Sequence, residues 1–369
     1  MKSYKYVLFV GLLMMLLLTS ACSSTRGPGV DRQFLTSLDN KLLFASGLER
    51  TTPFPSPAPG ISHDDVLKTV HAYPMALYLV KFQDGFQPQL LLDVIDDQSV
   101  SWQSAMSADL SFDGDQMAMV AAVRNGTEEI CVMKIDSGEW QQITHNSWIK
   151  QDPTWSPDGT RIAFSARAKD TNGDGAIDEK DAIEIYTINI DGSNLQQITF
   201  NGGHSTDPRW SPNGEWMVYR LRTKREQVHI DGLYLLHLKT GENRELVAGG
   251  GIAAPVSWSP DSRFIALAAA SGNKEKLWFG TDIYVQDVET GARIKLTDSH
   301  QYTPYRSWES GGIHLSNPVW SPDGEAIAFA WTWNDWNKHA VFVMSHDGSR
   351  LSQLTDWSEC SQIPLSWRP

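Results

Sequence analysis

Three scarcities limit what this 369-residue chain can be. It has only 3 cysteines, so it is not a small fold held together by disulfides. Its 31 basic residues are outnumbered by 44 acidic ones, and a net charge of −13 argues against a nucleic-acid partner, because phosphate contacts need a basic footprint. Neither a Gly-x-Ser-x-Gly nucleophile elbow nor a nucleotide-binding glycine loop occurs. The common hydrolase and nucleotide-binding classes are therefore not indicated.

Tryptophan, glycine and proline are abundant, with 15, 28 and 18 copies. Many aromatic residues separated by frequent Gly and Pro breaks are typical of short strands joined by tight turns. The composition therefore favours an all-β protein.

The apolar run at residues 6–18 follows Lys2 and Lys5. It is too short to span a hydrocarbon core of about 30 Å and is typical of a secretion signal. It ends in Leu-Thr-Ser-Ala before Cys22, which resembles the bacterial lipoprotein box. We therefore expect a signal peptide over 1–21 and a lipidated Cys22; an ordinary cleaved signal peptide is the alternative.

The lipoprotein resemblance also implies a location. Ser23, rather than Asp, follows the cysteine, and in such proteins this implies sorting to the outer membrane. We therefore expect a bacterial envelope protein on the periplasmic side, held to the membrane by its N-terminal lipid, with a linker over 22–37. The two other cysteines, Cys131 and Cys360, are expected to be buried free thiols, with a disulfide as the alternative.

Internal repeats indicate the fold. Near-copies of Pro-x-Trp-Ser-Pro-Asp-Gly recur, with anchor positions about 45 to 60 residues apart, close to the length of a four-stranded propeller blade. In each copy Pro presets φ and Gly accepts a positive φ, so the motif predicts a turn between two strands. The six anchors are Leu110, Trp155, Trp210, Trp258, Trp320 and Trp367.

The last repeat stops after one strand, and its missing strands match segments at 38–46 and 75–92. We therefore expect an all-β, six-bladed β-propeller of four-stranded blades over 38–369. Its last blade would combine the N-terminal strands with the C-terminal strand. Such closure leaves no gap between the first and last blades.

The repeat resembles that of the TolB-type propellers, which occur in the periplasmic protein TolB, in bacterial lipoproteins and in prolyl-oligopeptidase-like peptidases. The resemblance covers 38–369 and implies the fold strongly and the function weakly. It implies a non-enzymatic scaffold that binds an envelope protein. A carbohydrate-binding propeller, and a lyase or hydrolase acting at the channel mouth, are the alternatives.

One motif carries specific chemistry, the segment 170–181 between the second and third strands of the second blade. Its oxygen-bearing residues follow the order of a 12-residue calcium loop, with Gly175 at the sharp turn. We expect a structural Ca²⁺ ion there; a solvated acidic turn without metal is the alternative. The expected ligands are Asp170, Asn172, Asp174, Ala176 (through its carbonyl), Asp178 and Asp181.

Two aromatic segments in the C-terminal third are expected on loops, where they could contact a partner or a glycan. We favour packing at the blade interface or on one another over this contact role. The candidate contact residues are Tyr302, Tyr305, Trp308, Trp331, Trp333 and Trp336.

Several histidines fall in the loops that enter inner strands, where propeller enzymes carry acid–base or metal-binding groups. Their offsets within the repeat differ, so ordinary loop residues are the alternative. They are His145, His204, His300 and His314. Recurring polar residues before the repeat proline, namely Asp152, Asp207 and Asn317, are expected to fix the entry turn, or alternatively to ring the channel with acceptors.

Overall fold

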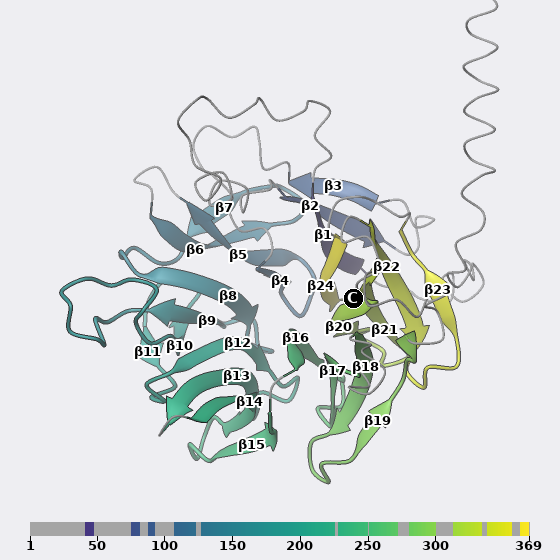
Figure 1. Ribbon diagram of the computed structural model, residues 1–369. Coiled ribbons are helices and arrows are strands. Elements are labelled where there is room, and N and C mark those ends of the chain that lie inside the picture. Colours follow the sequence, from purple (N-terminus) through teal and green to yellow (C-terminus); the bar gives the residue numbers. More distant parts are fainter. Residues whose placement is uncertain are drawn as a thin grey trace, which may run out of the picture.

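The protein is a ring of antiparallel sheets (Figure 1). The computed structural model describes residues 41–47, 75–81, 88–92, 107–122, 127–225, 228–249, 251–271, 280–299, 313–333, 338–355 and 362–368. All 24 named elements in these residues are strands. No helix in this part of the chain has the length and apolar character needed to cross a bilayer. The prediction of an all-β propeller is confirmed.

Five blades are each built from four consecutive strands. Blade 1 contains β4 (Ala108–Leu110), β5 (Gln116–Ala122), β6 (Glu128–Lys134) and β7 (Trp140–Gln142). Blade 2 contains β8 (Ile149–Trp155), β9 (Arg161–Arg167), β10 (Glu184–Asn189) and β11 (Gln196–Gln197). Blade 3 contains β12 (His204–Trp210), β13 (Trp216–Arg225), β14 (Val228–His237) and β15 (Asn243–Val247). Blade 4 contains β16 (Ile252–Trp258), β17 (Phe264–Ala270), β18 (Thr281–Asp287) and β19 (Arg293–Lys295). Blade 5 contains β20 (His314–Trp320), β21 (Ala326–Trp333), β22 (Lys338–Ser345) and β23 (Leu351–Gln353).

The remaining four-stranded sheet is discontinuous in sequence, with the strand order β24-β1-β2-β3. Its strands are β24 (Gln362–Arg368), β1 (Lys41–Gly47), β2 (Met75–Lys81) and β3 (Pro88–Leu92). Strand β24 pairs antiparallel with β1, so that Leu42 lies opposite Trp367. The prediction of a six-bladed propeller is therefore corrected to five blades, because the last repeat supplies only its first strand and the remaining sheet combines strands from both ends of the chain.

The core lies between neighbouring blades, because apolar side chains project from both faces of each middle strand. One hydrophobic cluster joins Ala118 and Val120 of blade 1 to Trp155, Ile162 and Phe164 of blade 2. The anchor Trp155 and the strand residue Phe164 are both 0% exposed. Burying a side chain such as Phe164 contributes about 1.5–3 kcal/mol, so packing between blades is the main force that holds the ring together.

The Ser-Pro-Asp-Gly turn is held by its own serine. In blade 2, Ser156 Oγ donates to Asp158 Oδ1 at 2.6 Å and accepts the backbone N–H of Arg161 at 2.9 Å. Gly159 has a φ of 67°, in the left-handed region that glycine adopts without strain. The turn therefore follows from local sequence, as the repeat predicts.

The threonine that ends the fourth strand ties it to the third. In blade 2, Thr199 Oγ1 accepts the N–H of Ile185 at 2.8 Å and donates to Glu184 Oε2 at 2.5 Å. Blade 1 repeats the arrangement with Thr144 and Glu129. These bonds satisfy a buried carboxylate and a strand N–H together, which explains why the threonine recurs.

Candidate functional site

The first strand of each sheet lies toward the centre of the ring, where β4, β8, β12, β16, β20 and β24 surround the channel (Figure 1). Three of these inner strands carry the recurring polar residue before proline, at Asp152, Asp207 and Asn317. Their φ values are 55°, 54° and 52°, and each coincides with a register shift. Asp and Asn tolerate this left-handed conformation better than most residues, which explains their use at the bulge.

The bulge residues also connect neighbouring blades. Asp152 Oδ1 accepts Ser107 Oγ at 3.1 Å, and Asp152 Oδ2 accepts the backbone N–H of Asp207 at 3.2 Å. Burial, followed by the charge of Asp152, raises the pKa of Asp207 to about 6. The recurring residues therefore shape the inner strands and bring the carboxylates of Asp152 and Asp207 close together.

A cavity lies at the end of the channel where the inner strands finish. Residues from all six inner strands line it, among them Asp109, Arg209 and Arg368. Its volume of about 60 Å³ is far below the roughly 300–1,000 Å³ typical of small-molecule pockets. The cavity is therefore small compared with a typical small-molecule pocket.

The candidate histidines that the structure describes lie on separate blades or connections. His204 begins β12 and His314 begins β20, so they lie on blades 3 and 5. Burial lowers the pKa of both. His300 lies outside the described residues. Across the parts of the chain that the structure describes, no group of three or more His, Cys, Asp or Glu side chains is placed to hold a metal ion.

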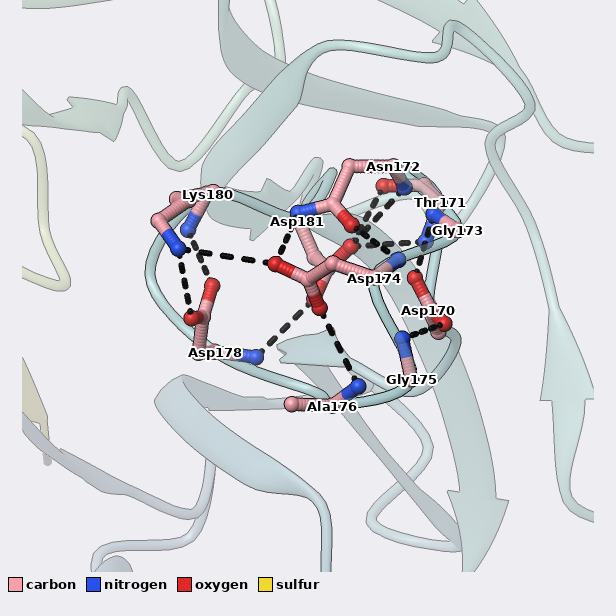
Figure 2. A network of polar contacts seen from close by, with 10 residues as sticks. All are labelled: Asp170, Thr171, Asn172, Gly173, Asp174, Gly175, Ala176, Asp178, Lys180 and Asp181. Atoms are coloured by element: carbon pink, nitrogen blue, oxygen red, sulfur yellow. Dashed lines mark hydrogen bonds and ion pairs between the residues drawn. The ribbon is translucent and has the colours of Figure 1, made fainter.

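The segment 170–181 forms a compact loop between β9 and β10 (Figure 2). Asp170 accepts the N–H groups of Gly173 at 2.6 Å and Gly175 at 2.8 Å. Asn172 Oδ1 accepts the N–H of Asp174 at 2.8 Å. The loop therefore closes on its own amides, with each of these oxygen-bearing side chains capping a turn.

Asp181 ends the loop and is buried. It accepts the backbone N–H groups of Asp178, Thr171 and Asn172. These hydrogen bonds lower the pKa of Asp181 to about 2, and the one from the N–H of Asp178 has the largest effect. A second contact holds the other side of the loop, where Lys180 Nζ lies 3.4 Å from both Asp174 and Asp178. The sequence-predicted ligands thus lie in one loop, but among the described residues their carboxylates form no group of three or more placed to hold a metal ion.

The aromatic residues at the C-terminal end of blade 5 require a correction. Trp331 is 1% exposed and packs on Phe342, with ring centroids 4.7 Å apart, so it is part of the core and not a surface contact. The expected loop is strand, because β21 continues to Trp333. The period-two alternation of Ile327, Phe329 and Trp331 is the signal that predicts this continuation. The other expected contact residues, Trp336, Tyr302, Tyr305 and Trp308, lie outside the described residues, as does Cys22.

Three exposed apolar side chains at one end of blade 2 are not among the residues that the sequence indicates as a site. Phe200 is 75% exposed, Ile177 is 37% exposed and Ile149 is 36% exposed. They come from connections at the same end of the blade: Ile149 begins β8, Ile177 lies in the loop after β9, and Phe200 follows β11. An apolar phenylalanine directly after the strand-ending Thr199 is the only signal in the sequence.

The sheets arranged around a channel define a β-propeller protein. A family model described as the TolB beta propeller domain matches residues 78–278, more than half of the chain. The chain therefore belongs to the TolB β-propeller family.

Its relatives agree with this assignment. The chain is 27% identical over 169 residues to the protein TolB homolog of Chlorobium luteolum, covering 46% of this chain and 33% of that protein. It is 25% identical over 191 residues to the uncharacterized peptidase YuxL of Bacillus subtilis, covering 43% of this chain and 28% of that protein. The chain thus spans about a third or less of the length of these relatives.

Solved structures share the fold. The crystal structure of TolB from Acinetobacter baumannii has a TM-score of 0.60 and 20% identity, over 89% of this chain and 67% of that one. The putative TolB from Agrobacterium tumefaciens has a TM-score of 0.53 and 16% identity, over 89% of this chain and 98% of that one.

Proposed function

We propose that this protein is a non-enzymatic scaffold of the bacterial cell envelope whose propeller binds a protein partner. The family match carries the proposal, since the TolB beta propeller domain covers more than half of the chain. In support, the Tol-Pal system protein TolB of Desulfosudis oleivorans is 32% identical over 123 residues, which are 33% of this chain and 24% of that protein.

The partner would dock on blade 2 through Phe200, Ile177 and Ile149. The loop that carries Ile177 is tied to the connection that carries Phe200. The N–H of Ile183 donates to Gly203 O at 2.9 Å, and the N–H of Ser205 donates to Ile183 O at 2.8 Å. These bonds hold the two connections side by side, so the apolar side chains stand on a preformed support. Burying Phe200 alone would contribute about 1.5–3 kcal/mol to binding.

The test is capture of the full-length protein from crosslinked bacterial envelopes, followed by mass spectrometry. Phe200→Ser removes the most exposed apolar side chain. Ile294→Ser is the matched control, because Ile294 is 60% exposed on β19 of blade 4. We expect one envelope protein that is lost with Phe200→Ser and kept with Ile294→Ser. An identical set of captured proteins for both variants would contradict the docking face, and no reproducible partner for the native chain would contradict the scaffold.

The proposal includes a lipid anchor on Cys22 and a place on the periplasmic side of the outer membrane. Support comes from the apolar run at 6–18 and the small residues that precede Cys22. Growth with a radiolabelled fatty acid should label the native chain and leave Cys22→Ala unlabelled. Sucrose-gradient separation of the two membranes should place the labelled protein in the outer fraction. Equal label in both variants would contradict the anchor.

The proposal also includes a structural calcium ion in the loop 170–181. The side-chain oxygens of this loop bind backbone amides, but each amide occupies one lone pair, and an ionised carboxylate offers about four. Asp170, Asp174 and Asp178 therefore keep acceptor capacity for a hard cation. The ion would offset the mutual repulsion of the acidic side chains and order the loop.

Thermal unfolding with added CaCl₂ or MgCl₂ tests this ion. We expect Ca²⁺ to raise Tm with a half-effect at about 10⁻⁴–10⁻³ M, and Mg²⁺ to act much less. Asp178→Asn should weaken the effect, whereas Asp191→Asn, in an exposed turn outside the loop, should not. An equal Tm in both salts would contradict the calcium loop.

A further inference from the structure

Four positions at which the chain departs from its own repeat line the cavity at the end of the channel. In the five continuous blades the residue after the anchor is serine, and its Oγ donates to the side chain two residues on at 2.5–2.6 Å. In β24 this residue is Arg368. Phe112 stands where the other turns have proline, and Asp109 and Arg209 precede their anchors where other blades have Thr, Ser or Val.

All four departures line the same cavity, although they come from β4, the turn after it, β12 and β24. A repeat that is otherwise regular would place a serine turn and small side chains at this end. Where several residues that break a sequence repeat lie together in the fold, a functional site is indicated.

Arg368 is held in a fixed position beside Asp109. Its guanidinium carbon lies 4.0 Å from the centre of the Phe112 ring, and its Nε donates to Leu110 O at 3.3 Å. Arg368 Nη2 lies 3.6 Å from Asp109 Oδ1. The side chain is 22% exposed, so most of it is enclosed by the protein. The planar guanidinium is therefore preorganised by stacking and by a backbone acceptor.

The carboxylate of Asp109 already accepts hydrogen bonds from blade 2. Its Oδ2 accepts Thr154 Oγ1 and the backbone N–H of Trp155, both at 3.0 Å. Arg209 brings a second guanidinium to the cavity, with one bond from Nη1 to Pro208 O at 3.2 Å. Each guanidinium has five N–H donors, so these bonds leave donors for a further acceptor.

Two arginines and one carboxylate, that of Asp109, line the cavity, and the carboxylate of Asp207 lies near enough to Arg209 to interact with it electrostatically. Burial lowers the pKa of Arg368; Asp109 opposes this shift, and the charge of Arg209 adds to it. An excess buried charge is costly unless a counter-charge with good hydrogen-bond geometry is supplied. A bound carboxylate would supply such a counter-charge to the guanidinium groups of Arg209 and Arg368.

We propose that this cavity is a carboxylate-binding site, in which Arg209 and Arg368 bind one carboxylate group above Asp109. A carboxylate matches the planar guanidinium fork in two parallel hydrogen bonds. A volume of about 60 Å³ admits one such group and not a larger anion such as a nucleotide. The carboxylate is either that of a small free acid or the terminal carboxylate of a polypeptide that enters the channel. This site is separate from the apolar face on blade 2.

Isothermal titration of the full chain at pH 7.5 tests the site with three probes. The first is sodium acetate, against sodium chloride at equal ionic strength. The other two are the tetrapeptide Gly-Ser-Gly-Ala with a free carboxyl end and the same peptide with an amidated end. The variants are Arg209→Gln, Arg368→Gln and Asp109→Asn. Arg263→Gln is the control, because Arg263 is 60% exposed and pairs with Asp287 away from the channel.

We expect saturable heat with acetate and none with chloride. Arg209→Gln and Arg368→Gln should weaken binding by about tenfold, the effect of one charge-assisted hydrogen bond. Asp109→Asn should tighten it by about threefold, because a competing negative charge is removed while the amide oxygen still accepts from Trp155. Arg263→Gln should leave it unchanged.

If only the free-ended peptide binds more tightly than acetate, the ligand is a polypeptide terminus; if both peptides bind no better than acetate, it is a small acid. Equal heats with acetate and chloride, or binding that Arg209→Gln leaves intact, would overturn the proposal. Arg209→Gln is decisive if Arg368→Gln fails to fold, because Arg209 is only half-buried.

Discussion

The buried ion pair between Lys150 and Glu129 makes a sharp prediction about stability. Lys150 Nζ lies 3.0 Å from Glu129 Oε2, and the two side chains are 0% and 2% exposed. The same ammonium donates to the backbone carbonyls of Glu128 at 2.8 Å, Trp148 at 2.9 Å and Asn146 at 3.1 Å. Because Lys150 lies in β8 and Glu129 in β6, the pair joins blade 2 to blade 1.

Replacing Lys150 with Met keeps most of the buried stem but leaves the Glu129 charge in the interior without its counter-ion. Removing one partner of a buried pair typically costs about 3–5 kcal/mol. Thr144 Oγ1 and the N–H of Asn146 still donate to Glu129, so the lower half of that range is expected. Lys134→Met is the control, because Lys134 and Glu139 form a pair at the same 3.0 Å with side chains 62% and 71% exposed. That pair should contribute about 0–1 kcal/mol.

The assay is urea unfolding followed by circular dichroism, with equal m-values required before midpoints are compared. Burial lowers the pKa of Lys150, although Glu129 opposes the shift. A lowered lysine pKa means that the unfolded chain binds the proton more strongly, so folding stability rises as pH increases toward 10.5. The free-energy difference between the native chain and Lys150→Met should therefore grow between pH 7 and pH 10. A Lys150→Met variant within 1 kcal/mol of Lys134→Met would refute this reasoning.

Three further predictions concern single residues. The raised pKa of Asp207, about 6, means that its folded form holds a proton more tightly than the unfolded chain, so stability is lost as pH rises from 3.8 through 6. Asp207→Asn should therefore raise the unfolding free energy by up to about 3 kcal/mol at pH 7.5 and by much less at pH 4, as measured by urea unfolding at both pH values. Gly348→Ala should lower Tm more than Gly138→Ala, as measured by calorimetry: both glycines have positive φ, but only at Gly348 does a Cβ meet a backbone oxygen, at 2.8 Å. Burial, and then the charge of Glu129, raises the pKa of the Cys131 thiol to about 12. Iodoacetamide at pH 8 should therefore leave Cys131 unmodified in the native protein and alkylate it in urea, as measured by peptide mass spectrometry.

Local features of the fold could be predicted because a few adjacent residues determine them. The Ser156 turn is one such feature, since its serine, aspartate and glycine satisfy the turn without help from other blades. The recurring threonine was visible as a pattern, but its bond to Glu184 was not, because the two residues lie 15 positions apart. The order of the oxygen-bearing residues in 170–181 was likewise a local pattern.

Features formed by distant segments could not be predicted in the same way. Asp109 and Arg368 are 259 positions apart and meet only because the ring closes. The sequence predicts a loop at Trp331 because this residue follows the expected end of its strand. Its position is instead decided by packing on Phe342 of the neighbouring strand and on blade 4. The exposure of Phe200 cannot be predicted from the sequence, because it depends on which side chains the folded ring places around this residue.

The pairing of β24 with β1 has a consequence for how the chain reaches its folded state. Lys41 lies opposite Arg368, so the two partners are more than three hundred residues apart in the sequence. Each continuous blade can form as soon as its own four strands exist, whereas β1 must wait for residues 362–368. Contacts of such sequence separation are slow to form, because the loop entropy is lost before the contact is gained. During synthesis β1 therefore has an unpaired edge until β24 has been made. The pairing of β24 with β1 is the last step that closes the ring.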